Sequence, residues 1–264
     1  MGDAVERTIL VSKGNAGVAT VTLNRPSRMN AFTRAMWEEL ASEMAELSRA
    51  AEVRCVVLRG AGREAFSAGA DIAEFESERG SAALARDYGA VMHMATTAIA
   101  RSLHPTVAAI RGACLGAGLV AAARCDLRLS GEGSRFGVPV SRIGINMPYP
   151  ELAALYDLAG RATTLELVLE GRIIEAGEAL EKGLVNRVVP DAGLDAAVTG
   201  MAERIAAGAP LANRQHKAIV RRLAEPRPPT EREIADSFSC FDTEDCREGH
   251  RAFLEKREPA FRGR

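Results

Sequence analysis

The stretch Thr106-Val-Ala-Ala-Ile-Arg-Gly-Ala-Cys-Leu-Gly-Ala-Gly118 decides the fold of this chain. Its apolar residues up to Ile110 predict a buried strand, and the small residues after Leu115 predict the start of a helix. Further upstream, Phe66-Ser-Ala-Gly-Ala-Asp-Ile72 ends in the same way. A helix start presents unpaired N–H groups and a positive dipole end, and small side chains let a ligand approach the backbone closely. Two such places, if they converge, hold a developing oxyanion.

Around these stretches, the apolar pattern predicts an α/β fold. Residues 8–12 and 18–24 predict a hairpin, and Thr33 is a candidate N-cap for the first long helix. Strands alternate with helices up to about residue 190, which predicts a core domain over residues 1–190 and a helical region over residues 191–264. Further predicted strands cover 53–59, 106–110, 127–130 and 186–189, and predicted helices cover 33–49, 74–103, 152–158, 162–169, 176–182, 194–207 and 231–257.

The composition excludes several classes of protein. The 264 residues carry a formal net charge of −1, which argues against a general nucleic-acid binder. Five cysteines without a CxxC pair indicate reduced thiols in the cytoplasm. The N-terminal residues lack the pattern of a signal peptide, and no apolar stretch reaches the ~20 residues that span a bilayer. We therefore expect a soluble cytoplasmic protein with no nucleic-acid and no membrane partner.

Several motifs together resemble one family over essentially the whole chain. They are Leu23-Asn-Arg-Pro-Ser-Arg-Met-Asn-Ala31, Phe66-Ser-Ala-Gly-Ala-Asp-Ile-Ala73, the Pro105–Gly118 stretch and the C-terminal Ala252-Phe-Leu-Glu-Lys-Arg257. The chain resembles the enoyl-CoA hydratase/isomerase (crotonase) superfamily. The resemblance implies a ββα spiral with a helical C-terminal region, an acyl-CoA thioester as substrate, and a homotrimer or a dimer of trimers. Coenzyme A enters as part of the substrate, so neither a separate cofactor nor a metal is expected.

The resemblance also implies roles for particular residues. The backbone N–H groups of Ala70 and Ala117 take the positions of the family's oxyanion hole, where each donor contributes ~3 kcal/mol. Arg28 would meet a phosphate, and Asp71 is expected to cap the turn that follows it. Lys256 and Phe261 stand where the family often completes the nucleotide pocket, sometimes across a subunit boundary. The expected substrate-binding residues are Arg28, Ala31, Ala68, Ala70, Asp71, Ile72, Ala73, Val120, Val140, Lys256 and Phe261.

The chain departs from the family at the positions that move protons. Hydratases of the family use two glutamates, and the matching positions here are Val120 and Val140. Valine neither accepts nor donates a proton, so we expect ordinary hydration to be weak. The loop over residues 143–151 offers Asn146, Tyr149 and Glu151 as substitutes. The alternative is that this loop only starts a helix, with a glutamate favoured by the helix dipole.

Four functions remain open from the sequence. The first is an enzyme that polarises an acyl-CoA thioester, and the second is a non-catalytic acyl-CoA or fatty-acyl binding protein. The third is a decarboxylase or thioester hydrolase that uses the 146–151 loop. The fourth is a dinucleotide-dependent oxidoreductase, because Gly116-x-Gly118-x-x-Ala121 loosely fits that fingerprint, although no acidic residue follows at the expected place.

Overall fold

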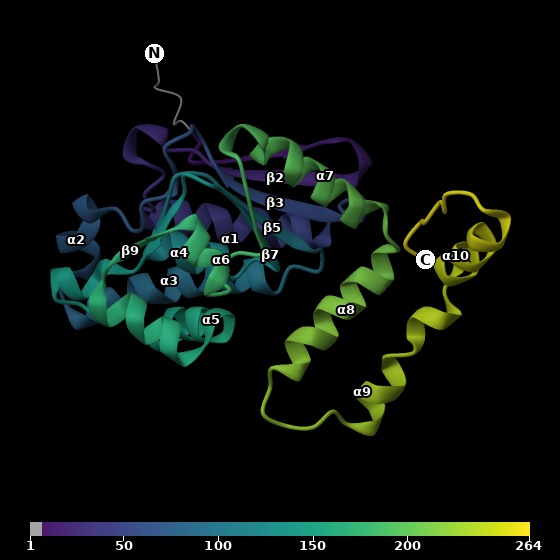
Figure 1. Cartoon of the computed structure of the whole chain (residues 1–264). Helices are drawn as coiled ribbons and strands as arrows, with labels where there is room; N and C mark the ends of the chain where they lie inside the picture. Colours follow the sequence, from purple (N-terminus) through teal and green to yellow (C-terminus); the bar gives the residue numbers. More distant parts are fainter. Residues whose placement is uncertain (1–6) are drawn as a thin grey trace, which may run out of the picture.

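The computed structural model describes residues 7–264, which form two β-sheets enclosed by helices (Figure 1). All strand pairs are parallel except the β1–β2 hairpin and the β8–β9 pair. The larger sheet has the order β1 (Ile9–Lys13), β2 (Val18–Leu23), β3 (Cys55–Gly60), β5 (Thr106–Ile110), β7 (Leu127–Gly131), β10 (Arg187–Val189). The smaller sheet has the order β4 (Ala65–Ser67), β6 (Ala113–Leu115), β8 (Arg135–Gly137), β9 (Ile173–Glu175).

The chain passes repeatedly from the larger sheet to the smaller one and then into a helix. Strands β3, β5 and β7 lie in the larger sheet, and each is followed by a strand of the smaller sheet. The corner between β5 and β6 needs a glycine, because Gly112 has φ +66° and an added Cβ would lie 1.9 Å from the Glu64 carbonyl oxygen. This repeated ββα order confirms the predicted α/β spiral.

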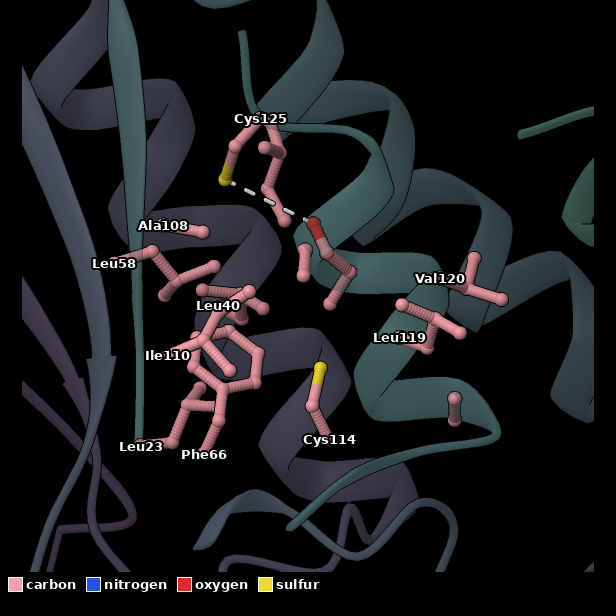
Figure 2. Packing of buried hydrophobic residues seen from close by; sticks show 14 of the residues in the cluster. Leu23, Leu40, Leu58, Phe66, Ala108, Ile110, Cys114, Leu119, Val120 and Cys125 are labelled. Carbon is pink, nitrogen blue, oxygen red and sulfur yellow. Dashed lines mark hydrogen bonds between the residues drawn. The ribbon is translucent and has the colours of Figure 1, made fainter. Parts of the chain in front are cut away.

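The main core lies between the larger sheet and helices α1 (Arg34–Arg49), α3 (Ala82–Ala100), α4 (Ala117–Ala123) and α5 (Tyr149–Glu170). Thr33 caps α1 as predicted, because its side chain accepts a hydrogen bond from the Met36 N–H. Trp37 stacks on Phe32 and donates its indole N–H to the Tyr88 hydroxyl over 3.0 Å. Figure 2 shows side chains of the sheet facing those of α4. At the end of α4 the Cys125 thiol donates to the Ala121 carbonyl oxygen.

The opposite face of the larger sheet is covered by α7 (Leu194–Ala207), which lies across the strands in Figure 1. Leu194, Val198 and Ala202 pack against Val57 and Val107 in a second apolar cluster. The sequence predicted this helix with the same bounds but assigned it to the helical region from residue 191. Through these contacts α7 packs on the larger sheet, because an uncovered sheet face would leave these apolar side chains in water.

The remaining helices depart from the sequence prediction at three places, one of which is that no helix was predicted over residues 210–223. The single helix predicted over 74–103 is two helices, because Ser81 caps α3 after α2 (Phe75–Arg79) has ended. The last predicted helix, 231–257, is likewise divided into α9 (Glu231–Asp236) and α10 (Glu244–Glu255). Within α5 the chain breaks at Gly160, as the sequence indicated, with φ 73° and ψ 176°. The other two helices are α6 (Ala176–Glu181) and α8 (Pro210–Leu223).

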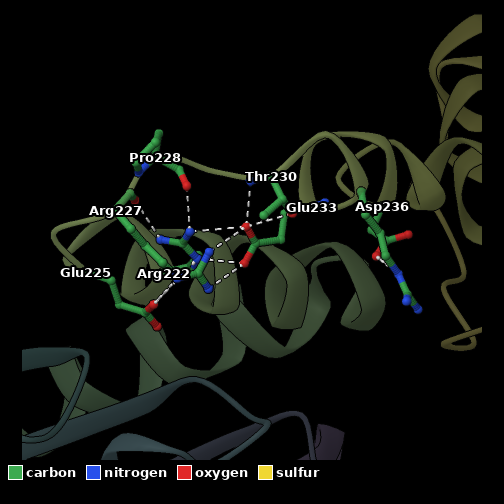
Figure 3. A network of polar contacts seen from close by, with 8 residues as sticks. Arg222, Glu225, Arg227, Pro228, Thr230, Glu233 and Asp236 are labelled. Carbon is green, nitrogen blue, oxygen red and sulfur yellow. Dashed lines mark hydrogen bonds and ion pairs between the residues drawn. The ribbon is translucent and has the colours of Figure 1, made fainter.

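Helices α8, α9 and α10 extend away from the core (Figure 1). The ammonium group of Lys217 holds α8 to the core, 2.8 Å from the Asp126 carboxylate. The bend between α8 and α9 is fixed by ion pairs from Arg222 and Arg227 to Glu233, which Figure 3 shows together with the capping Thr230. No helix within residues 7–264 has both the length and the apolar character needed to cross a bilayer.

A buried asparagine joins the segments that lead to the smaller sheet. Asn30 is fully buried and has φ +54°. Its amide nitrogen donates to the carbonyl oxygens of Ala61 and Ala65, over 2.9 and 2.8 Å, and its amide oxygen accepts from the Arg25 N–H. One side chain therefore satisfies three backbone groups of two separate loops.

We expect Asn30→Ala to lower the free energy of unfolding by about 2–4 kcal/mol, because it leaves buried backbone groups without partners. Denaturant unfolding measures the change. Asn24→Ala is the matched control, since Asn24 makes one exposed hydrogen bond and its loss should cost less than about 1 kcal/mol. Equal effects of the two substitutions would contradict this account of Asn30.

Candidate functional site

A cavity of about 390 Å³ lies where α3, the start of α4 and the segment before α5 meet the turn after β4. Its volume suits a small acyl group or cofactor fragment. Most of its lining is apolar, with one arginine and one glutamate. Lining residues include Ala68, Gly69, Ala70, Ile72, Phe75, Arg79, Tyr88, Met92, Gly116, Ala117, Val140, Ile143, Asn146, Met147 and Glu151.

Two backbone N–H groups in this lining have no hydrogen-bond acceptor among residues 7–264. One belongs to Ala70, which follows Gly69 in the turn after β4, and the other to Ala117, the first residue of α4. The first N–H groups of a helix have no partner within the helix and carry its positive dipole end. The structure thus brings Ala70 and Ala117, which the sequence singled out, to one cavity.

The two turns that carry these groups touch through their backbones. A Cβ added to Gly69, where φ is +106°, would lie 3.1 Å from the Leu115 carbonyl oxygen and 3.6 Å from the Ala117 nitrogen. A Cβ added to Gly118 would lie 2.6 Å from the Ser67 carbonyl oxygen. Glycine at both positions is therefore required for α4 to approach the turn after β4 so closely.

Backbone and side-chain hydrogen bonds hold the turn after β4 in place. The Phe32 N–H donates to the Gly69 carbonyl, and the Asp71 N–H donates to the Phe32 carbonyl, each over 2.7 Å. The Asp71 carboxylate accepts from the Ala73 N–H and from Arg25, which confirms the predicted cap. Burial opposes ionisation of Asp71, but these two hydrogen bonds outweigh it and lower its pKa.

Glu151 is a buried carboxyl group without a partner. It lies in the first turn of α5, is 3% exposed, and neither of its carboxylate oxygens has a hydrogen-bond donor among the described residues. Burial raises the pKa of Glu151, and the residue's own backbone N–H, together with His93 and Arg124, only partly opposes that effect. A glutamate that merely favours the helix dipole would remain in water, whereas this one lines the cavity.

Arg124 sets the position of the helix that carries Glu151. Its guanidinium donates to the Pro150 carbonyl over 2.6 Å, and Arg124 itself is the C-cap residue of α4. The start of α5 is therefore anchored to the same helix whose other end provides the Ala117 N–H. A carboxyl with a raised pKa beside donors for an oxyanion is typical of proton-transfer sites.

The other candidates of the loop and the two valines lie in different surroundings. Asn146 lines the cavity at its exposed edge, where its amide donates to the Met147 carbonyl over 3.4 Å. Tyr149, the first residue of α5, is 92% exposed and does not line the cavity. Val140 lines the cavity, whereas Val120 is fully buried in the core and does not.

Only some of the residues expected to bind coenzyme A lie at the cavity. Ala68 and Ile72 line the cavity, and Ala31 and Ala73 flank the same turn through the hydrogen bonds that Arg25 and Asp71 make to them. The remaining candidates lie outside the cavity of this chain. These are the exposed Arg28, Lys256 at the end of α10, and Phe261, which lines a separate apolar pocket of the extension.

Sequence reasoning did not single out Arg79, Tyr88 and Met92, which also line the cavity. Tyr88 and Met92 are one helical turn apart on α3, so their spacing indicated a buried face but not what that face contacts. Arg79 ends α2, and only the tertiary packing places its guanidinium over the rings of Phe75 and Tyr88.

The profile of a family described as enoyl-CoA hydratase/isomerase matches residues 13–264. This chain belongs to that family. The crystal structure of an enoyl-CoA hydratase/carnithine racemase from Magnetospirillum magneticum is similar with a TM-score of 0.96 and 47% identity, over 98% of this chain and 97% of that one. The match confirms the predicted crotonase fold.

Curated relatives in the enoyl-CoA hydratase/isomerase family match over nearly their whole lengths. The short-chain-enoyl-CoA hydratase of Clostridium acetobutylicum is 32% identical over 256 residues, which cover 96% of this chain and 97% of the relative. The crotonyl-CoA hydratase of Syntrophomonas wolfei is 33% identical over 246 residues, which cover 92% and 94%. The family relationship thus extends across both the core and the C-terminal extension.

The raised pKa of Glu151 predicts a pH-dependent gain of stability for Glu151→Gln. An unfolded glutamate titrates near ~4.3, so the folded state binds this proton more tightly. The stabilising contribution of protonated Glu151 is fully present below about pH 4. It is lost as the pH rises through the pKa of Glu151 in the folded state. We expect Glu151→Gln to stabilise the protein on the order of 1 kcal/mol near pH 8, with a gain that shrinks towards pH 4.

Thermal melts across this pH range test the prediction. Glu181→Gln is the control, because Glu181 is exposed and its substitution should change the melting temperature little at any pH. A Glu151→Gln variant that is less stable than the parent at pH 8 would show that the carboxylate has a stabilising partner.

Proposed function

We propose that this protein binds an acyl-CoA thioester in the cavity and stabilises its enolate through the N–H groups of Ala70 and Ala117. One observation carries the proposal: two acceptor-free backbone donors and a buried, unpartnered carboxyl line a single apolar cavity. The thioester oxygen gains negative charge as the α-carbon loses its proton. Donors aimed at that oxygen stabilise this charge, typically by ~3 kcal/mol each.

Glu151 acts in this proposal as the base. Its ionised carboxylate takes a proton from the carbon next to the thioester carbonyl, and the electrons of the broken C–H bond delocalise onto the thioester oxygen. Glu151 then returns the proton to the same carbon or to another carbon of the conjugated chain. Return to another carbon moves a carbon–carbon double bond, so one carboxyl group is sufficient for an isomerisation.

Hydration fits the site less well than isomerisation. It requires both activation of a water molecule and delivery of a proton to the α-carbon. By the sequence resemblance, Val120 and Val140 are expected at the positions where hydratases of the family carry glutamates. Val120 does not line the cavity. The hydratase names of the relatives support an acyl-CoA substrate for this chain. They do not determine which proton transfer it performs.

Binding of the thioester gives the first test. We expect butyryl-CoA at about 100 times its Kd to stabilise the protein by ~2.7 kcal/mol and raise its melting temperature, whereas NAD(H) leaves the temperature unchanged. Desulfo-CoA, which has the nucleotide but no thioester, is the control and should stabilise less. Stabilisation by NAD(H) alone would exclude the proposal in favour of a dinucleotide site.

Exchange of α-protons gives the second test. In D₂O, we expect the protein to incorporate deuterium at the α-carbon of butyryl-CoA, as measured by mass spectrometry. Glu151→Gln should slow this exchange 10²–10⁴-fold, because it removes the base. Tyr149→Phe is the matched control and should exchange at the parent rate, since Tyr149 lies in solvent.

The outcomes separate the competing functions. Exchange by Glu151→Gln at the parent rate would refute the role of this carboxyl. Tight binding without any exchange by the parent protein would indicate a non-catalytic acyl-CoA-binding protein, and loss of the thioester or of carbon dioxide would indicate a hydrolase or decarboxylase. Hydration of crotonyl-CoA is expected near background.

Three further expectations stay predictions: a cytoplasmic location, the absence of a separate cofactor, and assembly into a trimer or a dimer of trimers. The third has some physical support. Phe238, Phe241 and Phe253 of the extension are 61%, 70% and 81% exposed. The ring centres of Phe238 and Phe241 lie 6.2 Å apart, and large exposed apolar side chains favour contact with another copy of the chain.

A further inference from the structure

Arg79 is the one cationic side chain in the described lining of the cavity. Its guanidinium carbon lies 5.0 Å from the centre of the Phe75 ring and 4.8 Å from that of Tyr88. One terminal N–H group donates to the Asp71 carbonyl over 3.0 Å. The Tyr88 ring is itself held by the hydrogen bond from Trp37. The guanidinium is therefore held in one place between fixed groups.

The hydrogen-bonding capacity of Arg79 is largely unused. A guanidinium has five N–H donors, and the Asp71 carbonyl accepts one of them. The Nε–H is buried and has no acceptor, and no carboxylate within the described residues forms an ion pair with Arg79. Leaving a charged group without partners is costly, whereas its two terminal Nη groups match the two oxygens of a carboxylate.

We infer that Arg79 selects acyl groups that carry a carboxylate, so that the substrate class is the CoA thioester of a dicarboxylic acid. The inference rests on the proposed function, because it assumes that the acyl group occupies this cavity. The guanidinium lies over the rings of Phe75 and Tyr88, and the apolar Ile72 and Met92 line the same cavity. Such apolar surroundings strengthen a guanidinium–carboxylate pair relative to the same pair in water.

The selection follows from a difference between two ligands of equal length. A carboxylate at the end of the acyl chain pairs with the terminal N–H groups of Arg79 that the Asp71 carbonyl leaves free. A methyl group at the same place leaves the guanidinium without a partner and covers it with apolar surface. A hydrogen bond to a charged group is worth enough to change affinity by about 10- to 100-fold.

Isothermal titration with glutaryl-CoA and pentanoyl-CoA tests the inference on the full-length protein. The two acyl chains have the same number of carbon atoms, and both are saturated, so neither is consumed by isomerisation. We expect the parent protein to bind glutaryl-CoA about 10- to 100-fold more tightly than pentanoyl-CoA. Equal affinity, or a preference for pentanoyl-CoA, would overturn the inference.

Variants test whether Arg79 causes the preference for glutaryl-CoA over pentanoyl-CoA. Arg79→Met should weaken glutaryl-CoA binding by the same factor and leave pentanoyl-CoA binding unchanged or tighter, which also shows that the variant is folded. Arg79→Lys keeps the charge without the planar edge, so it should retain only part of the preference. Arg86→Met is the matched control, because Arg86 is exposed on α3 outside the cavity and should have no effect.

Free CoA distinguishes the acyl carboxylate from the phosphates of the nucleotide. If Arg79→Met weakens the binding of free CoA as much as it weakens the binding of glutaryl-CoA, then Arg79 contacts a phosphate and the inference is wrong. If the parent protein binds neither acyl-CoA, the proposed function itself fails and the inference fails with it. If it binds both equally, only the selection by Arg79 is refuted.

Discussion

The close approach of two backbone segments is the constraint on which the site depends. The turn after β4 and the start of α4 touch without intervening side chains, because Gly69 and Gly118 have no Cβ that would meet the facing backbone. This contact brings the N–H groups of Ala70 and Ala117 to one cavity. Larger residues would separate the two segments, and a separation of one or two ångströms would already remove a hydrogen bond to a shared oxygen. The ββα spiral provides the parallel strands β4 and β6 that lead into both segments.

At Glu151 the proposed function and the stability of the fold oppose each other. A buried carboxyl without a donor destabilises the folded state at neutral pH, and burial raises its pKa for the same reason. The rest of the molecule compensates through an extensive apolar core and through the anchoring of α5 to α4 by Arg124. Under the proposed function this cost has a use, because a carboxyl with a raised pKa is a stronger base towards a weakly acidic carbon.

Much of the fold could be predicted from the sequence because local patterns determine single elements. The β1–β2 hairpin, the Thr33 cap and the bounds of α7 all follow from periodicity and capping residues. The prediction of one helix over 74–103 was wrong at Gly80 and Ser81. There the Ser81 side chain caps a new helix instead of continuing the first one. The packing of α7 on the larger sheet could not be predicted, since its apolar face is equally compatible with any other apolar surface.

The features of the site also differ in whether the sequence could predict them. The sequence by itself determined the family, the two small-residue turns with Ala70 and Ala117, and valine at positions 120 and 140, because these are properties of short segments. Only the tertiary structure decided that Glu151 is buried in the cavity while Tyr149 is in solvent, and that Arg79 faces the same space. The physical reason is that burial and hydrogen-bond satisfaction depend on segments distant in the chain. Those segments meet at the cavity only after α2, α3, α4 and α5 have packed together.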